Sequence, residues 1–238
     1  MSDPVAPTDS ADSADSADSA HSAHSLVPGA GLVVRAGRLE LRAVTDDLLA
    51  PLGALAARGV HAPDAMPFLS PWSLAPADEL PLRVAQYHWG VRSRFSPQAW
   101  TLELAALWDG EPVGVQAVAT RDYLLTRTGE TGSWLGAAHQ GRGIGTAMRR
   151  ALCVLLVDHL DAAEVTSTAY ADSVASLAVS RKVGYVHDGT SRDVRTRAGR
   201  QEAVLLHRLV LRPERLVRGD APVEVRGVAP LRRLVGLG

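Results

Sequence analysis

Cysteine is almost absent from the 238-residue sequence, in which Cys153 is the single thiol. One cysteine cannot form a disulfide within the chain, and neither it nor the histidines show the spacing of zinc ligands, so we predict no metal site. Apolar runs are also short, and none approaches the roughly 20 residues that a membrane span requires. The amino-terminal segment lacks the basic and apolar regions of a secretion signal. We therefore expect a soluble, cytoplasmic protein with no membrane partner.

Neither sign of charge dominates, because 25 basic residues accompany 26 acidic ones and the formal net charge is -1. A dedicated nucleic-acid binder needs a clear cationic excess to neutralise phosphates, so we predict no nucleic-acid partner. The charge is unevenly distributed along the chain. Residues 1–30 contain five acidic residues and no lysine or arginine, which leaves 25 basic and 21 acidic groups on the other 208 residues. An excess of this size suits an anionic small ligand.

The chain divides into three parts by composition. Residues 1–30 repeat Asp-Ser-Ala and His-Ser-Ala, and they hold too few large apolar side chains to offset the entropy of ordering, which predicts a disordered tail. Residues 31–212 carry the periodic patterns of strands and helices and form the predicted folded domain. Residues 213–238 form a C-terminal extension, in which residues 223–228 can add a strand.

Strands and helices are interspersed in the predicted domain. Residues 39–43 alternate apolar and polar side chains, as a half-buried strand does, and Asp109-Gly110 predicts the tight turn of a hairpin. The expected strands are residues 39–43, 100–108, 113–120, 133–135, 164–168 and 203–211, the fourth of them preceded by a polar loop. Two helices are expected before the hairpin, one after the fourth strand and one over residues 173–183. This order predicts an α+β fold around a mixed sheet.

Proline leaves one question open in the first helix, which Thr45 and the acids after it can cap. Pro51 falls inside the apolar pattern of this helix, so the helix either begins after Pro51 or kinks there. The second helix is expected to open at Pro81. Between the two helices, residues 66–72 form an aromatic loop that is either a wall of a substrate pocket or core packing.

A glycine-rich turn, QGRGIGT at residues 140–146, lies between a strand and an apolar helix. Unpaired N–H groups at the start of a helix favour an anion, and glycine lets the backbone approach a phosphate closely. A nucleoside-triphosphate loop would need lysine followed by serine or threonine after Gly145, where Thr146 and Ala147 stand. A dinucleotide fingerprint would need glycine in place of Thr146. Taken alone, the turn could also be no more than a helix cap.

The glycine turn does not stand alone. It is followed by a strand, by SVAS at residues 173–176 and by RKVGY at residues 181–185. In this order and spacing, residues 38–212 resemble the GNAT acetyltransferase superfamily, and within it the branch of ribosomal-protein N-terminal acetyltransferases (RimJ/RimL-like). The resemblance implies a mostly antiparallel central sheet with a splayed parallel strand pair, flanked by helices. It also implies acetyl-coenzyme A (acetyl-CoA) as cosubstrate.

The resemblance assigns the binding of this cosubstrate to particular residues. Main-chain N–H groups of the turn would bind the pyrophosphate, and Thr146 would cap the helix nearby. The backbone near Leu135 would pair with the pantetheine arm and orient the thioester carbonyl. The coenzyme-binding residues implied in this way are Leu135, Gln140, Gly141, Arg142, Gly143, Gly145, Thr146 and Ser173.

Two positions depart from the family pattern. Ser173 stands where the family has asparagine, and Ser180 stands where many members carry a tyrosine. A tyrosine therefore cannot be the acid here, and we expect Ser176 to donate a hydrogen bond to the coenzyme sulfur as the thiolate leaves. The alternative for Ser176 is a helix-face serine whose hydroxyl bonds back to a carbonyl one turn earlier.

The implied reaction is direct attack of a primary amine on the thioester, without a covalent enzyme intermediate. The amine must first lose a proton, which a carboxylate can accept directly or through water. Glu103 and Glu130 are the candidate bases, with His88 and His139 as alternatives. Cys153 falls among apolar helix residues, so we expect a core side chain rather than a nucleophile.

We predict an N-acetyltransferase that uses acetyl-CoA and acts as a monomer or homodimer. Its acceptor is a primary amine, either a protein or peptide N-terminus or a small molecule. The alternative is a non-catalytic acyl-CoA sensor that kept the ligand turn, because Ser173 and Ser180 replace polar groups seen in relatives. Both would bind the coenzyme, so only turnover separates them.

Overall fold

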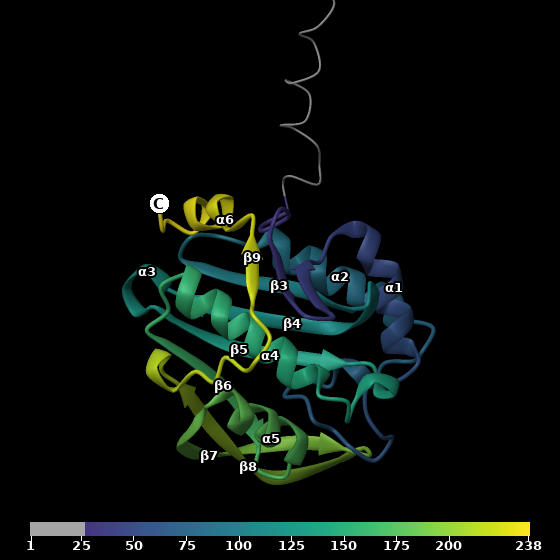
Figure 1. Ribbon diagram of the computed structural model, residues 1–238. Helices are drawn as coiled ribbons and strands as arrows, with labels where there is room; N and C mark the ends of the chain where they lie inside the picture. The colour runs from purple at the N-terminus through teal and green to yellow at the C-terminus, as the bar shows by residue number, and fades with distance from the viewer. Residues whose placement is uncertain (1–26) are drawn as a thin grey trace, which may run out of the picture.

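The computed structural model describes residues 27–238, so residues 1–26 of the predicted tail lie outside it. The strands are β1 (Val33–Ala36), β2 (Leu39–Ala43), β3 (Ala99–Trp108), β4 (Glu111–Arg121), β5 (Thr128–Leu135), β6 (Glu164–Tyr170), β7 (Val186–Arg197), β8 (Arg200–Leu211) and β9 (Glu224–Arg226). The helices are α1 (Asp46–Ala57), α2 (Leu80–Ser93), α3 (Tyr123–Thr126), α4 (Ile144–Val154), α5 (Val174–Val183) and α6 (Val228–Leu234). Figure 1 shows them around a single sheet.

The nine strands of residues 27–238 follow the order β7-β8-β6-β5-β4-β3-β2-β1-β9. Within this sheet only β5 and β6 pair in parallel, and every other neighbouring pair is antiparallel. Asp109 and Gly110, with φ of 53° and 87°, form the two-residue turn between β3 and β4 that the sequence predicts. The predicted fold class, a mostly antiparallel mixed sheet with one parallel pair and flanking helices, is confirmed.

Helices cover both faces of the sheet, and alternate residues of β3 identify the two faces. Leu102 belongs to the core beneath α4, together with Met148. Ala105 belongs to a second core beneath α1 and α2, together with Leu52. Helix α5 contacts α4 and lies on its side of the sheet, and Figure 1 shows both in front of the strands. We call the two sides the α4 face and the α1 face.

Helices α1 and α2 pack closely against each other. Helix α1 begins at Asp46 and continues through Pro51, so the first of the two alternatives, a start after Pro51, is excluded. Helix α2 carries Pro81 in its first turn, as predicted, where the missing N–H has no helical partner to lose. A Cβ atom built at Gly53 of α1 would lie 2.6 Å from Cα of Pro81. Only glycine therefore allows this approach of the two helices.

Neither threonine expected as a helix cap forms a side-chain cap bond. The hydroxyl of Thr45, before α1, donates to the carboxylate of Asp47 instead. At α4, Gly143 is the residue before the helix, and Thr146 contributes its backbone N–H, which donates to the Gly143 carbonyl at 3.1 Å. The glycine turn is thus closed by main-chain bonds.

Strand β5 is longer than predicted, since it begins at Thr128, and the expected polar loop before residue 133 contains helix α3 and the first part of this strand. Its parallel pairing with β6 covers only residues 128–130 against 164–166. Beyond Glu130, β5 remains paired with β4 while β6 remains paired with β8, so the two strands separate. At the point of separation, Thr131 Oγ1 donates to the Thr166 carbonyl at 3.0 Å. This is the splayed parallel pair that the resemblance implied.

The sheet of the described residues ends in β7 at one edge and in β9 at the other. Strand β7, which the sequence analysis did not identify, pairs with β8 along its whole length. Strand β9 lies within the range expected for the C-terminal strand and pairs with β1 at the opposite edge. After it, Leu231, Val235 and Leu237 are buried in the main core. Among residues 27–238 we find no helix whose length and hydropathy would allow it to traverse a bilayer.

Candidate functional site

A cleft of about 880 Å³ lies where β5 and β6 separate. Its walls come from both faces of the sheet, with Tyr87 of α2 on the α1 face and the glycine turn and α5 on the α4 face. The sequence-predicted residues that line it are Glu103, Glu130, Leu135, Gln140, Gly141, Gly143, Gly145, Thr146, Ser173 and Ser176. Arg142 is exposed and is not among the lining residues. The structure therefore brings almost all of the candidate residues together.

The glycine turn presents bare main chain to this cleft. Gly141 and Gly143 have φ of 72° and 81°, a left-handed conformation that favours glycine. A Cβ atom built at either position would meet no heavy atom within 4 Å, so the space in front of the turn is open. Within the described chain, no acceptor is found for the N–H groups of residues 141–145. Free donors at the start of an 11-residue helix form a site suited to an anion.

Gln140 fixes the position of the turn. Its Nε2 donates to the carbonyl of Val60 at 2.7 Å and to the carbonyl of Leu135 at 3.0 Å. The first bond ties the turn to the loop after α1, and the second ties it to the end of β5. Gln140 thus connects the glycine turn to two other segments, and the Leu135 carbonyl accepts one of its hydrogen bonds.

Glu103 lies on the α1 face of β3 and is buried where it lines the cleft. The hydroxyl of Tyr87 donates to its Oε1 at 2.7 Å. Burial disfavours the charged carboxylate and raises the pKa of Glu103 to about 7, although the bond from Tyr87 acts in the opposite direction. A carboxyl that titrates near neutrality, buried in a cleft, has the properties of a general acid or base.

The other candidate bases have different surroundings. Glu130 lines the cleft but is exposed. His88 is buried, and burial together with the charge of Arg92 lowers its pKa to about 4, so its ring is neutral at pH 7. His88 lines a small cavity that shares Thr101 and Glu103 with the cleft, and His139 is not among the residues that line the cleft. Glu103 is therefore the candidate whose pKa and location both suit proton transfer.

Three serines of α5 and its N-terminus were singled out from the sequence. Ser173 precedes α5 and makes no side-chain cap bond. Ser176, one turn along, lines the cleft, and its hydroxyl has no hydrogen-bond partner in residues 27–238, so the expected alternative of back-bonding is not observed. Ser180 is buried, and its Oγ likewise lacks a partner within the described chain.

The aromatic loop and Cys153 also have clear places. Phe68 lines the cleft and packs against Trp72 at a ring-centroid distance of 5.2 Å, and Trp72 packs against Trp134 at 5.7 Å, with both pairs of rings tilted. The loop is thus both a wall of the cleft and part of the packing beneath it. Cys153 is buried in the main core, and burial raises the pKa of its thiol to about 11. Residues 27–238 contain no group of three or more His, Cys, Asp or Glu side chains that could hold a metal ion.

Sequence reasoning missed the two buried arginines of the cleft. Arg149 of α4 is buried, and its guanidinium donates to Ser167 Oγ at 3.1 Å and to Ser133 Oγ at 3.4 Å, one hydroxyl from each of the splayed strands. The signal in the sequence is a charged residue next to Met148, on the apolar side of a helix. The other missed arginine is Arg195, the one fully buried residue of β7.

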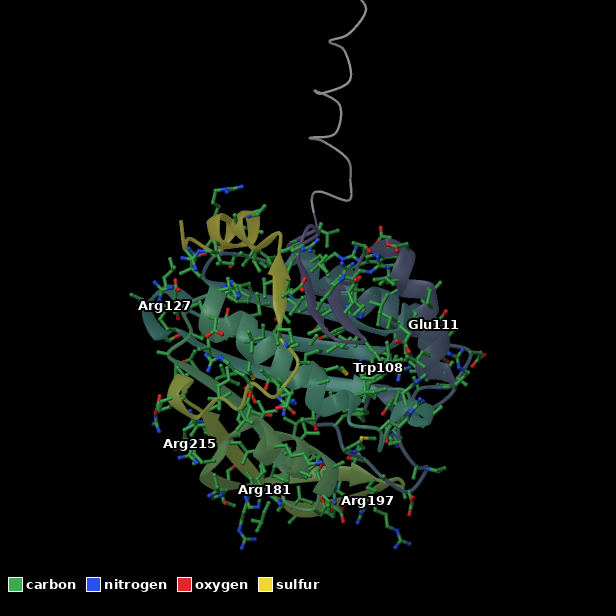
Figure 2. The ribbon with its side chains drawn as sticks, in the orientation of Figure 1. Trp108, Glu111, Arg127, Arg181, Arg197 and Arg215 are labelled. Carbon is green, nitrogen blue, oxygen red and sulfur yellow. The ribbon has the colours of Figure 1, made fainter. Side chains whose placement is uncertain are left out.

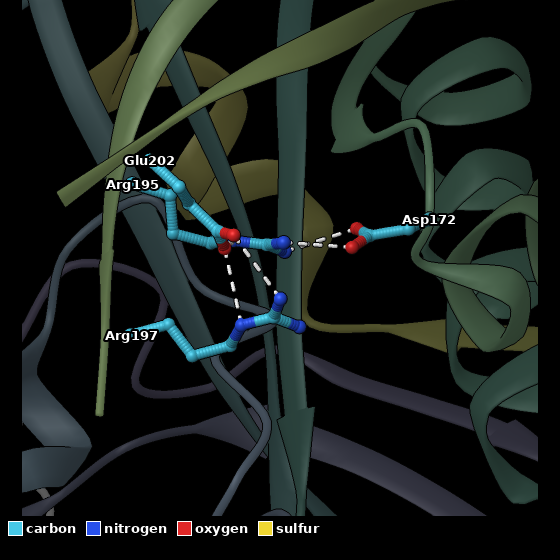
Figure 3. A network of polar contacts seen from close by, with 4 residues as sticks. All are labelled: Asp172, Arg195, Arg197 and Glu202. Atoms are coloured by element: carbon cyan, nitrogen blue, oxygen red, sulfur yellow. Dashed lines mark hydrogen bonds and ion pairs between the residues drawn. The ribbon is translucent and has the colours of Figure 1, made fainter. Parts of the chain in front are cut away.

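Arg195 lines the cleft and lies at the centre of a network of polar contacts with Asp172, Arg197 and Glu202, drawn in Figure 3. Its guanidinium forms two bonds to Asp172, at 2.9 and 2.7 Å, and one to Glu202 at 2.8 Å. It also lies 4.6 Å from the centroid of the Tyr170 ring. These contacts join the β7–β8 hairpin to the loop in front of α5, and they hold the pKa of Asp172 below its usual range.

Comparison with known proteins relates this geometry to other chains. The YdaF protein of Bacillus subtilis (strain 168), whose name describes it as a ribosomal N-acetyltransferase, is 29% identical over 92 residues. That match spans 39% of this chain and half of the relative's length. RimL ribosomal L7/L12 α-N-protein acetyltransferase, solved with coenzyme A, matches with a TM-score of 0.59 at 19% identity over 79% of this chain and 99% of its own. Mycobacterium smegmatis RimJ, solved with a CoA disulfide, matches with a TM-score of 0.60 at 19% identity over 77% of this chain and 88% of its own.

The family assignment rests on the sequence as well as the fold. Residues 38–186, which contain α1 to α5 and both splayed strands, match the model of the acetyltransferase (GNAT) domain. The solved structures share the fold at low identity, and the splay and the glycine turn lie inside the matched range. The chain belongs to the GNAT family of acetyltransferases.

Proposed function

We propose that the chain transfers an acetyl group from acetyl-CoA to a primary amine by direct attack in a ternary complex. The observation that carries the proposal is the continuity of one cleft, which joins the bare glycine turn on the α4 face to buried Glu103 on the α1 face. Membership of the GNAT family supports the reaction class. The acceptor and the roles of individual residues follow from the chemistry of the cleft.

The glycine turn would hold the pyrophosphate of the coenzyme. The residues fit this group, since the N–H groups of residues 141–145 have no acceptor within the described chain and the space in front of Gly141 and Gly143 is open. When bound, the coenzyme supplies a thioester whose carbonyl an amine can attack. The backbone near Leu135 would pair with the pantetheine arm, and Gln140, which donates to the Leu135 carbonyl, would act through positioning.

Glu103 would accept the proton that the attacking amine loses. With a pKa of about 7, the Glu103 carboxyl is ionised in roughly half of the molecules at neutral pH, which is the condition under which a general base is effective. Tyr87 stabilises the ionised form through its hydrogen bond. Glu130 is the second candidate, because it lines the same cleft from an exposed position.

Ser176 would stabilise the leaving thiolate. Its hydroxyl has no partner in the described chain, so it is free to donate to a sulfur atom in the cleft. A serine hydroxyl is too weak an acid for full proton transfer, so its contribution is a hydrogen bond that strengthens as charge develops. Ser173, at the start of the same helix, would contact the coenzyme.

We propose a protein or peptide N-terminus as the acceptor, entering on the α1 face beside Phe68 and Tyr87. The relative and the solved RimL protein are named for ribosomal proteins, which supports a peptide over a small amine. The cleft has a volume of about 880 Å³, and Glu103 is among its lining residues. A coenzyme A thioester donor agrees with the cytoplasmic location expected from the sequence.

The test is release of coenzyme A thiol from acetyl-CoA in the presence of N-terminal peptides, polyamines, aminoglycosides and amino acids. Peptide-dependent release, with the acetyl group recovered on the α-amine by mass spectrometry, is the expected result. Measured binding of acetyl-CoA without release for any amine would replace the proposal with a non-catalytic acyl-CoA sensor. An absence of coenzyme binding would contradict both.

A further inference from the structure

Arg149 is a buried cation without a counterion in the described chain. It is 4% exposed, whereas Arg181 and Arg215 extend outward from the molecule (Figure 2). Its terminal nitrogens donate to the hydroxyls of Ser133 and Ser167, and its Nε has no hydrogen-bond partner among residues 27–238. Its Cζ lies 5.8 Å from the centroid of the Tyr185 ring, which is also a neutral group. The ion pairs formed by the described residues do not include it.

Burial of a guanidinium with only neutral partners is unfavourable unless another group compensates the charge. Three acids line the same cleft. Glu130 is exposed and forms no ion pair with Arg149 within the described chain, and the other two are placed for other contacts. Glu103 lies on the α1 face and accepts from Tyr87, while Asp172 is held by Arg195. Arg149 also lines the cleft, so its charge and its unused N–H groups are available to an anionic group that enters the splay.

The position of Arg149 indicates which reactant carries that anion. Arg149 lies on α4 and contacts Ser133 of β5 and Ser167 of β6, so it faces the gap between the splayed strands from the α4 face. The pyrophosphate of the donor is assigned to the glycine turn at the start of the same helix. The acceptor is assigned to the opposite face, beside Glu103. An anion that reaches Arg149 therefore belongs to the acyl part of the donor.

We infer that the cleft accepts a donor whose acyl group ends in a carboxylate, a short dicarboxylic acyl-CoA of the malonyl or succinyl class, and that Arg149 binds this carboxylate. The inference rests on the proposed function, and it extends the range of donors from acetyl-CoA to acyl-CoA thioesters that end in a carboxylate. A guanidinium can bind a carboxylate through two parallel hydrogen bonds, which a neutral acyl chain cannot form. Ser133 and Ser167 hold the guanidinium in place through hydrogen bonds to its terminal nitrogens.

The transfer step balances without a further reactant. The lone pair of the amine forms a bond to the thioester carbonyl carbon, and the carbon–sulfur bond breaks with its electron pair on sulfur. The amine proton passes to Glu103, and the coenzyme leaves as thiolate, which takes up a proton from solvent. The product is an amide that ends in a free carboxylate, so the acceptor loses a positive charge and gains a negative one.

The decisive measurement compares donors on the wild-type protein. Dissociation constants are determined by titration calorimetry for coenzyme A, acetyl-CoA, succinyl-CoA and butyryl-CoA, the last a neutral chain of the same carbon number as succinyl. We expect succinyl-CoA to bind at least about tenfold more tightly than butyryl-CoA, because a charge-assisted pair in a buried site is stronger than apolar contact. Equal affinity for the two overturns the inference, whereas failure of coenzyme A itself to bind overturns the proposed function instead.

Two variants locate the effect. Arg149→Met keeps the length of the side chain without its charge, and we expect it to abolish the preference for succinyl-CoA while leaving the affinity for coenzyme A within about twofold. Arg149→Lys keeps the charge without the paired donors and should retain part of the preference. Lys182→Met removes another cation that lines the cleft and serves as the matched control, with the preference unchanged. Thermal melting confirms that each variant is folded.

Other outcomes contradict the inference in distinguishable ways. A large loss of affinity for coenzyme A itself in Arg149→Met would assign the guanidinium to a phosphate of the coenzyme. An unchanged preference among donors, together with slower turnover of acidic acceptors, would assign it to the acceptor. If Arg149→Met does not fold, the comparison of donors on the wild-type protein still decides the question.

Discussion

Tyr87 of α2 donates a hydrogen bond of 2.7 Å to Glu103 of β3, so a helix on the α1 face sets the protonation of a carboxyl inside the cleft. Burial raises the pKa of Glu103 to about 7, and the bond from Tyr87 keeps it from rising further. The two residues are 16 positions apart and are brought together by the packing of α2 on the sheet. This relationship leads to the first prediction.

If Glu103 is the base, the rate of acyl transfer at low amine concentration should rise with pH and level off above about pH 7, where Glu103 is ionised. Tyr87→Phe removes the bond that favours the ionised form, so the inflection should move to higher pH. Tyr123→Phe removes a buried hydroxyl that donates to Leu160 elsewhere in the core and should leave the inflection unchanged. A profile that is identical in wild type and Tyr87→Phe would remove Tyr87 from this role.

Glu103→Gln should lower turnover by about 10²- to 10⁴-fold with little change in coenzyme affinity, since it removes a general base. It should also alter the dependence of stability on pH. The folded protein binds the Glu103 proton more tightly than the unfolded chain, because the pKa rises from 4.5 to about 7, so this stabilisation is present at low pH and is lost as pH rises towards 7. The variant lacks that loss and should be more stable than wild type above pH 7, by up to about 3 kcal/mol in denaturant titrations. A stability difference independent of pH would contradict the raised pKa.

Gly143→Asp should weaken coenzyme binding at least about 100-fold, because it places a carboxylate in front of the unpaired N–H groups of the turn. Gly110→Asp is the matched control. Gly110 also has positive φ and open space around it, but it lies in the turn between β3 and β4. Both variants carry similar backbone strain, so equal losses of affinity would show that the effect is not local to the turn.

Ser176→Ala should reduce turnover about tenfold and spare coenzyme affinity, since its hydroxyl is proposed to act only when sulfur becomes charged. Ser180→Ala, one turn further along α5, provides the comparison. Its buried hydroxyl has no partner in the described chain, so its removal should leave turnover unchanged and increase stability slightly. Unaltered single-turnover rates in Ser176→Ala would exclude the residue from the chemical step.

Gly53→Ala should destabilise the protein by about 1–3 kcal/mol, because the added methyl group would meet the backbone of Pro81 and force α1 and α2 apart. Gly31→Ala, where an added Cβ meets no atom within 4 Å, should have a small effect. Denaturant unfolding measures both. A Gly53→Ala variant as stable as wild type would show that the two helices can separate without cost.

The sequence was informative wherever local pattern and tertiary structure agree. The alternation of β3 and the Asp109-Gly110 pair predicted the hairpin, because turn chemistry and burial act over short distances. Strand β7 could not be predicted in the same way, since it is exposed along almost its whole length and its buried residue is Arg195. The strand is stabilised by its pairing with β8 and by the ion pairs that Arg195 forms with Asp172 and Glu202. Hydrophobic periodicity along the sequence indicates neither kind of interaction.

The candidate site also contains residues that local sequence pattern predicts and residues whose role depends on the folded structure. The glycine turn was readable because φ above zero and bare backbone require glycine at particular positions, such as Gly141 and Gly143. The choice between Glu103 and Glu130 was not readable, because the two differ in burial, which only the folded sheet determines. Arg149 was not predicted for a related reason. A charged residue beside apolar helix residues can be placed in the cleft only once the strands opposite it are known to separate.

The brevity of the parallel pairing between β5 and β6 has a kinetic consequence. Three residues of each strand are joined before the strands diverge, so the opening they leave is accessible from either side of the sheet. Two reactants that approach from opposite sides need not pass one another to depart. For the proposed transfer we therefore expect the two products to leave in either order, and product-inhibition patterns of a random sequential mechanism would be the result that checks this.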